Sequence, residues 1–353
     1  MKGDPKGFWP VLERIPGLAA VEAEWRNYMG DDYELGKAFL RPNGRLAASH
    51  PCVVPRGCGC HHDVIVHGDE DIEAVCHCES GCDTFALKQA DIVVYELDRT
   101  RLCSALAEAI GLSRASHSST DMQETHLVGV YSPFAGYRFN VYLTIQLERG
   151  DFNAVVDGLT SRADKPFILL APTRDFCASI TETRLAQHKS AFVPLSENAA
   201  VTDNRILRLI HTLEEILKEF HTSNLPSSKS DDTVAFFPTP SDARWSDVSI
   251  RFKDGFTVSV KVKSAAGVFN YTQMGMANRK NGNPTVRWDL LRDFAEEHGE
   301  LVWGSSRAHR RNQKRRELLA ADLCAFFRIE GDPFRLTKDG KGWEARFHIY
   351  PDR

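Results

Sequence analysis

The chain has 353 residues, of which 42% are apolar and 26% are charged, and a formal net charge of −4 at pH 7. This length exceeds the size at which one hydrophobic core usually stops growing, so two or three domains are expected. The longest apolar runs fall far short of the roughly 20 residues that span a bilayer, which excludes a transmembrane helix. The first residues, MKGDPKGFWP, lack the apolar core of a secretory signal, and we therefore expect a cytoplasmic protein.

Charge is distributed unevenly along the chain. From Trp245 to Arg353 there are 20 Lys and Arg against 14 Asp and Glu, a net charge of +6, whereas the remainder carries −10. Residues 223–246 are rich in Ser, Pro and Asp and are interpreted as a linker. With a second boundary near Leu97, the expected domains are residues 1–97, 98–222 and 247–353.

Six of the nine cysteines lie within 31 residues of the first domain: Cys52, Cys58, Cys60, Cys76, Cys78 and Cys82. In a chain without an export signal, this clustering favours a bound metal over disulfides. Zinc prefers four ligands at tetrahedral corners, and two turns separated by a β-hairpin deliver them from both sides. The segment between the two cysteine groups predicts such a hairpin. We therefore expect a zinc-ribbon-like module that holds a structural Zn²⁺.

The spacing does not select four ligands among these six cysteines, because C-x-C and C-x3-C differ from the usual C-x2-C pairs. Four nearby histidines are alternative ligands: His61, His62, His67 and His77. A catalytic zinc needs an open coordination position and usually a carboxylate base, but the acids of the spacer HGDEDIE look like turn residues. A structural metal is therefore favoured. The module, which ends in DIVVYELD, also resembles a stretch of uncharacterised bacterial proteins.

The central region alternates helix-like and strand-like segments. Helices are expected over residues 100–111, 151–162 and 175–188, and strands over 126–131, 138–147, 166–170 and 191–195. Helices interleaved with apolar strands predict a small α/β domain, and its sheet is mixed if the first two strands form a hairpin. The end of the third strand, Leu169 to Arg174, is the best place for a ligand, since open sheets bind ligands at the carboxyl ends of strands.

A helix is expected over residues 203–221, because Ile206, Ile210, Leu213, Leu217 and Phe220 recur at heptad-like spacing. Two heptads are too few to define a coiled coil. Packing against the α/β domain is the favoured interpretation, and homodimerisation through this helix is the alternative.

The sequence carries no P-loop, G-x-S-x-G, H-E-x-x-H or dinucleotide-binding signature, so a catalytic role is not favoured. Two alternatives to a binding protein stay open. One is a nucleic-acid-directed enzyme or enzyme subunit with its site in the α/β domain. The other is an adaptor that binds protein partners.

The C-terminal region begins with alternating apolar residues on both sides of Asp254-Gly255, which predicts a β-hairpin. A helix is expected to start with Asn283 as N-cap and Pro284 at its first position, and to end before Gly299. A basic helix over residues 309–327 follows, and a final hairpin encloses a Lys-Asp-Gly-Lys-Gly loop.

This order of elements resembles the winged-helix output domain of response-regulator-type transcription factors over about 105 residues. The resemblance implies that helix 309–327 lies in the major groove and that loop 338–342 is a wing. The chain departs from this family in one respect: only the segment LVWGSSRAHR is present to form the short helix that precedes the recognition helix. RNA is less favoured than DNA, because the sequence lacks aromatic residues in the RNP pattern.

Basic side chains neutralise phosphates and amide side chains read base edges, so this end of the helix and the loop are the expected DNA contacts. The expected contact residues are Arg307, Arg310, Arg311, Asn312, Gln313, Lys314, Arg315, Lys338 and Lys341. The sequence thus predicts a multidomain α+β or α/β protein that contains zinc and binds double-stranded DNA. Its expected role is that of a regulator or of the DNA-recognition component of a bacterial complex.

Overall fold

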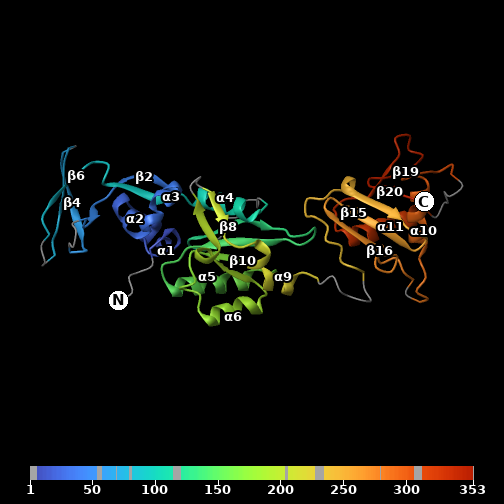
Figure 1. The fold of residues 1–353 in the computed structure, drawn as a ribbon, viewed down its shortest axis with the longest axis horizontal. Helices are drawn as coiled ribbons and strands as arrows, with labels where there is room; N and C mark the ends of the chain where they lie inside the picture. Colours follow the sequence, from blue (N-terminus) through green and yellow to red (C-terminus); the bar gives the residue numbers. More distant parts are fainter. Residues whose placement is uncertain are drawn as a thin grey trace. The chain divides into compact units, whose positions relative to one another are not determined.

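The fold is taken from a computed structural model, which describes residues 6–53, 58–68, 70–78, 82–113, 121–202, 206–226, 234–278, 280–305 and 312–352. The chain forms two compact units with mixed helices and strands (Figure 1). Unit 1 consists of Met1–Tyr131 and Phe139–Asn224, and unit 2 of Ser132–Arg138 and Leu225–Arg353. The expected boundary at Leu97 does not separate compact units. Among the described residues, no helix has both the length and the apolar character needed to cross a bilayer.

Unit 1 begins with three short helices beside a small antiparallel sheet of order β1-β7-β2. The helices are α1 (Phe8–Leu12), α2 (Glu22–Met29) and α3 (Tyr33–Gly36), and the strands are β1 (Ala19–Val21), β7 (Val93–Leu97) and β2 (Leu40–Leu46). Trp25 is fully buried, and its indole N–H donates to the carbonyl of Tyr95 at 3.0 Å. This bond ties α2 to β7, so the helices and the sheet share one core.

The cysteine module, residues 49–87, is a second antiparallel sheet of order β3-β4-β5-β6. Its strands are β3 (Ser49–Pro51), β4 (His61–Gly68), β5 (Asp71–Val75) and β6 (Phe85–Leu87), of which β4 and β6 are labelled in Figure 1. The expected hairpin between the cysteine groups is present as β4 and β5. The apolar cluster at this sheet contains only four buried residues, Ile72, Ala74, Leu87 and Ile92. So small a core leaves the module in need of another source of stability.

The central sheet of unit 1 has the order β11-β10-β9-β8 and is mixed, as expected. β8 (Thr125–Tyr131) is antiparallel to β9 (Phe139–Thr144), whereas β10 (Ile168–Ala171) is parallel to both β9 and β11 (Ala191–Pro194). The helices α5 (Arg149–Arg162) and α6 (Ser179–Gln187) lie together on one face of the sheet (Figure 1). Helix α4 (Arg99–Ile110) contacts β8. The bounds of these helices and strands differ from the expected bounds by four residues or fewer.

The expected helix over residues 203–221 is wrong. Strand β12 (Ala199–Thr202), which follows the short helix α7 (Leu195–Asn198), pairs with β13 (Ile206–Leu209). Two short helices then follow, α8 (Leu213–Ile216) and α9 (Lys218–Asn224). Ile206 is 45% exposed while its neighbour Leu207 is 2% exposed, which is the alternation of a strand. The heptad-like spacing therefore does not form a continuous surface for dimerisation.

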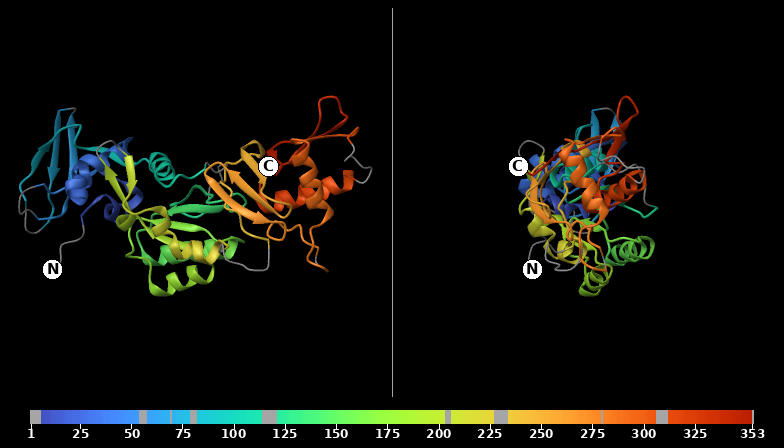
Figure 2. Two further views of the ribbon diagram at one scale, coloured as in Figure 1. Left: turned by 45° about the vertical axis from the view of Figure 1, so that its right-hand side comes forward. Right: turned by 90° about the vertical axis from the view of Figure 1, so that its right-hand side faces the viewer.

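The described residues of unit 2 form two sheets and two α-helices. The four-stranded sheet has the order β16-β15-β14-β20 and is built from β14 (Val248–Phe252), β15 (Thr257–Val262), β16 (Ala265–Asn270) and β20 (His348–Tyr350). The three-stranded sheet has the order β17-β19-β18, from β17 (Glu300–Val302), β19 (Gly342–Ala345) and β18 (Phe334–Leu336). In Figure 2, α10 (Val286–Glu296) and α11 (Asn312–Phe327), in orange, lie beside the larger sheet. The core between them includes Trp288, Phe294, Phe326 and Phe327.

Three expectations for unit 2 need correction. Helix α10 starts after Thr285 and not after Asn283, because Asn278 donates to the carbonyl of Asn283 at 2.8 Å and holds that residue in a turn. The last strand leaves the final hairpin and pairs in parallel with β14. Within the expected linker, Phe237 and Trp245 are only 0% and 4% exposed and belong to the core of unit 2, so residues 234–246 are part of the fold.

Candidate metal centre

The four strands of the cysteine module bring all six clustered cysteines to one end of their sheet. Cys52 follows β3, Cys58 and Cys60 precede β4, Cys76 and Cys78 follow β5, and Cys82 precedes β6. In an antiparallel sheet, neighbouring strands run in opposite directions, so the last residues of one strand lie beside the first residues of the next at the same end of the sheet. The amide of Cys52 donates to the carbonyl of Cys60 at 3.0 Å, and this hydrogen bond joins β3 to β4 at the cysteine end of the sheet.

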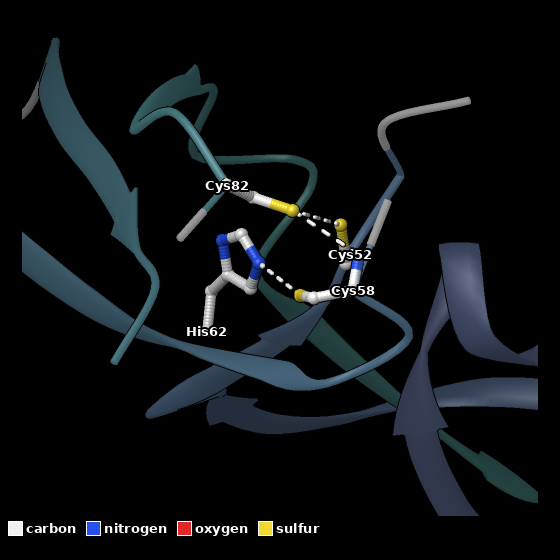
Figure 3. Close-up of side chains that lie close together, drawn as sticks. All are labelled: Cys52, Cys58, His62 and Cys82. Carbon is white, nitrogen blue, oxygen red and sulfur yellow. Dashed lines mark hydrogen bonds between the residues drawn. The ribbon is translucent and has the colours of Figure 1, made fainter. Parts of the chain in front are cut away.

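Four of the candidate ligands form a compact group: Cys52, Cys58, His62 and Cys82 (Figure 3). Their donor atoms all lie within 4.8 Å of one another. Sγ of Cys52 is 3.8 Å from Sγ of Cys82, and Sγ of Cys58 is 3.5 Å from Nε2 of His62. The amide of Cys58 donates to Sγ of Cys82 at 3.1 Å, an interaction that stabilises a thiolate.

These separations suit a tetrahedral zinc ion. With metal–sulfur bonds near 2.3 Å and metal–nitrogen bonds near 2.0 Å, the edges of the tetrahedron measure about 3.8 Å between two sulfurs and about 3.5 Å between sulfur and nitrogen. The two measured distances, 3.8 and 3.5 Å, agree with those edges. His62 is fully buried, and its Nδ1 has no hydrogen-bond partner among the described residues. A buried imidazole beside three thiols fits a metal ligand better than a core residue.

A second group shares one cysteine with the first and consists of Cys58, Cys76 and Cys78. Sγ of Cys58 lies 3.7 Å from Sγ of Cys76, which in turn lies 3.0 Å from Sγ of Cys78. Cys60 stands outside both groups, but its Sγ lies 3.7 Å from the carbonyl oxygen of Cys58. The clustered cysteines and His62 have the donor atoms and the spacing to hold a metal ion.

The structure places only one of the four alternative histidines in the centre. Nε2 of His61 lies 3.5 Å from Glu24 and Nε2 of His77 lies 3.2 Å from Asp63, while His67 is exposed. Strand alternation in the sequence does not select His62, because Cys58 and Cys60 precede β4, which begins at His61.

The structure describes six of the nine expected DNA-contacting residues, and these fall on α11 and on the loop between β18 and β19. Gln313, Lys314, Lys338 and Lys341 are exposed and Arg315 is half-buried, whereas Arg307, Arg310 and Arg311 lie outside the described residues. Asn312 is only 2% exposed, which contradicts the expectation that it reads base edges. Asn312 is the first residue of α11, and the apolar core residues of that helix follow from Leu319 onward.

An exposed tryptophan, missed by the sequence interpretation, lies beside the loop of residues 338–342, hereafter the wing loop. The amide of Trp303 donates to the carbonyl of Lys341 at 2.8 Å, and its ring centroid is 6.3 Å from that of Trp343. Trp303 remains 54% exposed. A large aromatic side chain held at the surface beside basic residues is typical of a binding surface.

The strand end that seemed best suited to a ligand is closed by side chains of unit 1 itself. The buried carboxylate of Glu13 accepts hydrogen bonds from the amide and the hydroxyl of Thr173. Arg174 pairs with both Glu182 and Glu197. The side chains of Glu13, Thr173 and Arg174 at the end of β10 therefore have partners within unit 1.

Comparisons of the chain with protein-family models, with curated proteins and with solved structures find no match.

Proposed function

We propose that this protein is a zinc-stabilised DNA-binding protein, in which the cysteine module holds zinc and unit 2 contacts double-stranded DNA. The observation that carries the DNA part is the hydrogen bond from Trp303 to Lys341. It attaches the end of β17 to the wing loop, and the sequence that continues from Trp303 to α11 contributes Arg307, Arg310 and Arg311.

The charge of this surface supports the same function. Lys338 and Lys341 are exposed in the wing loop, and Lys314 is exposed at the start of α11. Arg316 differs from them, because it pairs with Asp332 at 2.6 Å and serves the packing of the unit. Cations that face water neutralise phosphates and release counterions, which gives affinity that falls steeply with salt.

The arrangement of elements in unit 2 supports a winged-helix-like mode of contact only in part. In its favour, the loop of residues 338–342 joins β18 to β19 within the sheet β17-β19-β18. Between β17 and α11, however, residues 303–305 form turns and residues 306–311 lie outside the described residues. We therefore assign the contacts to α11, Trp303 and the wing loop.

Zinc has a structural role in this proposal. The apolar cluster at the sheet of the cysteine module contains four buried residues, and small modules of this kind draw folding free energy from the bound metal. Among the described residues, the candidate ligands of the centre are all cysteine or histidine. With the end of β10 closed by Glu13, an enzyme is not favoured.

A polarisation titration against random double-stranded DNA over a salt series tests the DNA part. For nonspecific binding, each lost phosphate contact reduces the slope of log affinity against log salt by about 0.9. The double variant Lys338→Ala/Lys341→Ala should therefore lower the magnitude of the slope by about two. Lys253→Ala/Lys261→Ala, which removes the same charge from β15 and from the turn before it, is the matched control.

Two results would contradict the proposal. One is an absence of binding to DNA at low salt. The other is an equal loss of affinity in both double variants, since net charge alone would then account for binding. Replacing Trp303 with Ala adds a third measurement. Loss of the indole should weaken DNA binding, but it should change the slope of log affinity against log salt by less than the value of about 0.9 expected for one phosphate contact.

A further inference from the structure

The cysteine module contains more metal ligands than one ion uses. Six thiols and the imidazole of His62 give seven donors at one end of the sheet, and a tetrahedral zinc ion takes four. The group of Cys52, Cys58, His62 and Cys82 already supplies a full set. Cys60, Cys76 and Cys78 would then remain as unused thiols beside a metal centre, although they lie close to it.

The geometry points to a second ion that shares one ligand with the first. Sγ of Cys58 is 3.5 Å from Nε2 of His62 on one side and 3.7 Å from Sγ of Cys76 on the other. Both values are close to the edges of a zinc tetrahedron, which are about 3.5 and 3.8 Å for these donor pairs. Cys58 is the one residue that belongs to both groups of ligands found among the described residues.

Cys60 is the remaining thiol of the cluster and lies directly beside the shared ligand Cys58. Its Sγ is 3.7 Å from the carbonyl oxygen of Cys58, and its amide donates to Sγ of Cys58 at 3.4 Å. Because Cys58 belongs to both groups of ligands, this proximity makes Cys60 the candidate for the fourth ligand of the second ion.

We propose that the cysteine module binds two zinc ions bridged by the thiolate of Cys58. One ion is held by Cys52, Cys58, His62 and Cys82, and the other by Cys58, Cys60, Cys76 and Cys78. Seven donors with one bridge make eight bonds, which is four for each ion. Loading two Zn²⁺ onto six protonated thiols releases six protons, and the centre with its neutral imidazole carries a charge of −2.

The inference rests on the zinc part of the proposed function, and the test separates the two. Zinc is counted by elemental analysis of the purified full-length protein, and protons released on loading the apoprotein are counted by titration in weakly buffered solution. The expected result is two zinc ions and six protons for each chain. One zinc ion with three protons would leave the Cys58 bridge without support and would overturn the inference.

Variants assign each ion to its own ligands. Cys52→Ser removes a ligand of the first ion alone and Cys76→Ser a ligand of the second, so each should retain one zinc ion. Cys58→Ser should lower the zinc content more than either. Cys103→Ser, a cysteine on α4 in the same unit, is the matched control and should keep both ions. If Cys76→Ser keeps two ions, the second ligand set is wrong.

Cadmium-113 NMR tests the bridge without any substitution. The wild-type chain loaded with ¹¹³Cd should give two resonances, one from four sulfur ligands and one from three sulfurs and a nitrogen, with coupling between the two nuclei through the shared thiolate. A single resonance would overturn the inference, as would a disulfide between Cys76 and Cys78, whose Sγ atoms are 3.0 Å apart. Two ions in a protein that fails to bind DNA would support the inference and contradict the DNA part of the proposed function.

Discussion

The amide of Thr173 lies 3.2 Å from Oε1 of Glu13, a residue 160 positions earlier in the chain, and the Thr173 hydroxyl donates to the other carboxylate oxygen. This pair joins the end of α1 to the loop after β10 in the interior of unit 1. Burial raises the pKa of Glu13, and the hydrogen bonds from Thr173 oppose that shift.

The raised pKa of Glu13 predicts a loss of stability as the pH rises. The folded state binds this proton more tightly than the unfolded chain, so its contribution is complete below the unfolded pKa and is lost as the pH passes the folded pKa. In Glu13→Gln, that pH dependence should disappear. Glu13→Ala should cost about 1–3 kcal/mol at pH 7, because the Thr173 donors lose their acceptor. Urea unfolding of both variants from pH 4 to pH 8 measures this, and a parallel pH dependence of wild type and Glu13→Gln would contradict it.

The pKa of Glu124 is shifted in the opposite direction, and its ion pair with Arg99 is expected to stabilise the folded state. The guanidinium contacts both carboxylate oxygens, at 2.7 and 2.8 Å, and Nε2 of His126 lies 3.9 Å away. The His126 and Arg99 side chains lower the pKa of Glu124 to about 2. With allowance for its partial exposure, Glu124→Gln should cost about 1–2 kcal/mol at pH 7.

This stabilisation should vanish in acid. Because the folded pKa is the lower one, the difference between wild type and Glu124→Gln should shrink as the pH falls from the unfolded pKa toward about 2. Glu344→Gln is the control, since the Arg335–Glu344 pair has a similar geometry but an exposed arginine. Its unfolding midpoint should hardly change. Equal effects of the two substitutions would show that burial of the Arg99–Glu124 pair does not matter.

Patterns that reflect local geometry predicted much of the fold. The hairpin of β14 and β15 follows from the strict alternation around Asp254-Gly255, and the α/β order of residues 99–194 follows from its helix and strand periods. The continuous helix expected over residues 203–221 failed, because Ile206 lies in the strand β13, whereas Leu213 and Phe220 lie in the separate short helices α8 and α9. Tertiary pairing of β13 with β12 decides between helix and strand, and single-sequence periodicity does not contain that information.

Burial was harder to predict than secondary structure. Residues 234–246 have the composition of a linker, yet Phe237 packs against Phe326 and Phe327 in the core of unit 2. The burial of Phe237 and Trp245 holds this otherwise polar segment against unit 2. For the metal centre, the sequence identified the six cysteines, but the grouping around Cys58 depends on the pairing of four strands.

Arg287 on α10 and Asp322 on α11 form an ion pair of low exposure. Because of this pair, Arg287→Ala should destabilise the protein more than the double substitution Arg287→Ala/Asp322→Ala. Arg287 and Asp322 lie 2.9 Å apart, with side chains 23% and 17% exposed. Burial raises the pKa of Asp322, and Arg287 opposes that shift. Arg287→Ala leaves the carboxylate without its partner and should cost about 2–4 kcal/mol, whereas Arg287→Ala/Asp322→Ala should cost less. Denaturant unfolding of all four proteins measures the coupling, and additive effects would mean that the two charges do not interact.

Chelation of the metal should loosen the cysteine module and leave unit 2 unchanged. The module has a small core of its own, so much of its folding free energy is expected to come from metal binding. Unit 2 has its own extensive core, which contains no residue of the cluster. Hydrogen exchange measured by mass spectrometry resolves the two parts within one sample. After treatment with a chelator, amides in β4 and β5 should exchange faster, while those in β14 and β15 keep their protection. Restoring zinc should reverse the change, and Cys82→Ser should reproduce it without chelator. Unaltered protection of β4 and β5 in the metal-free protein would mean that the strands fold without the metal, and the structural role assigned to zinc would be wrong.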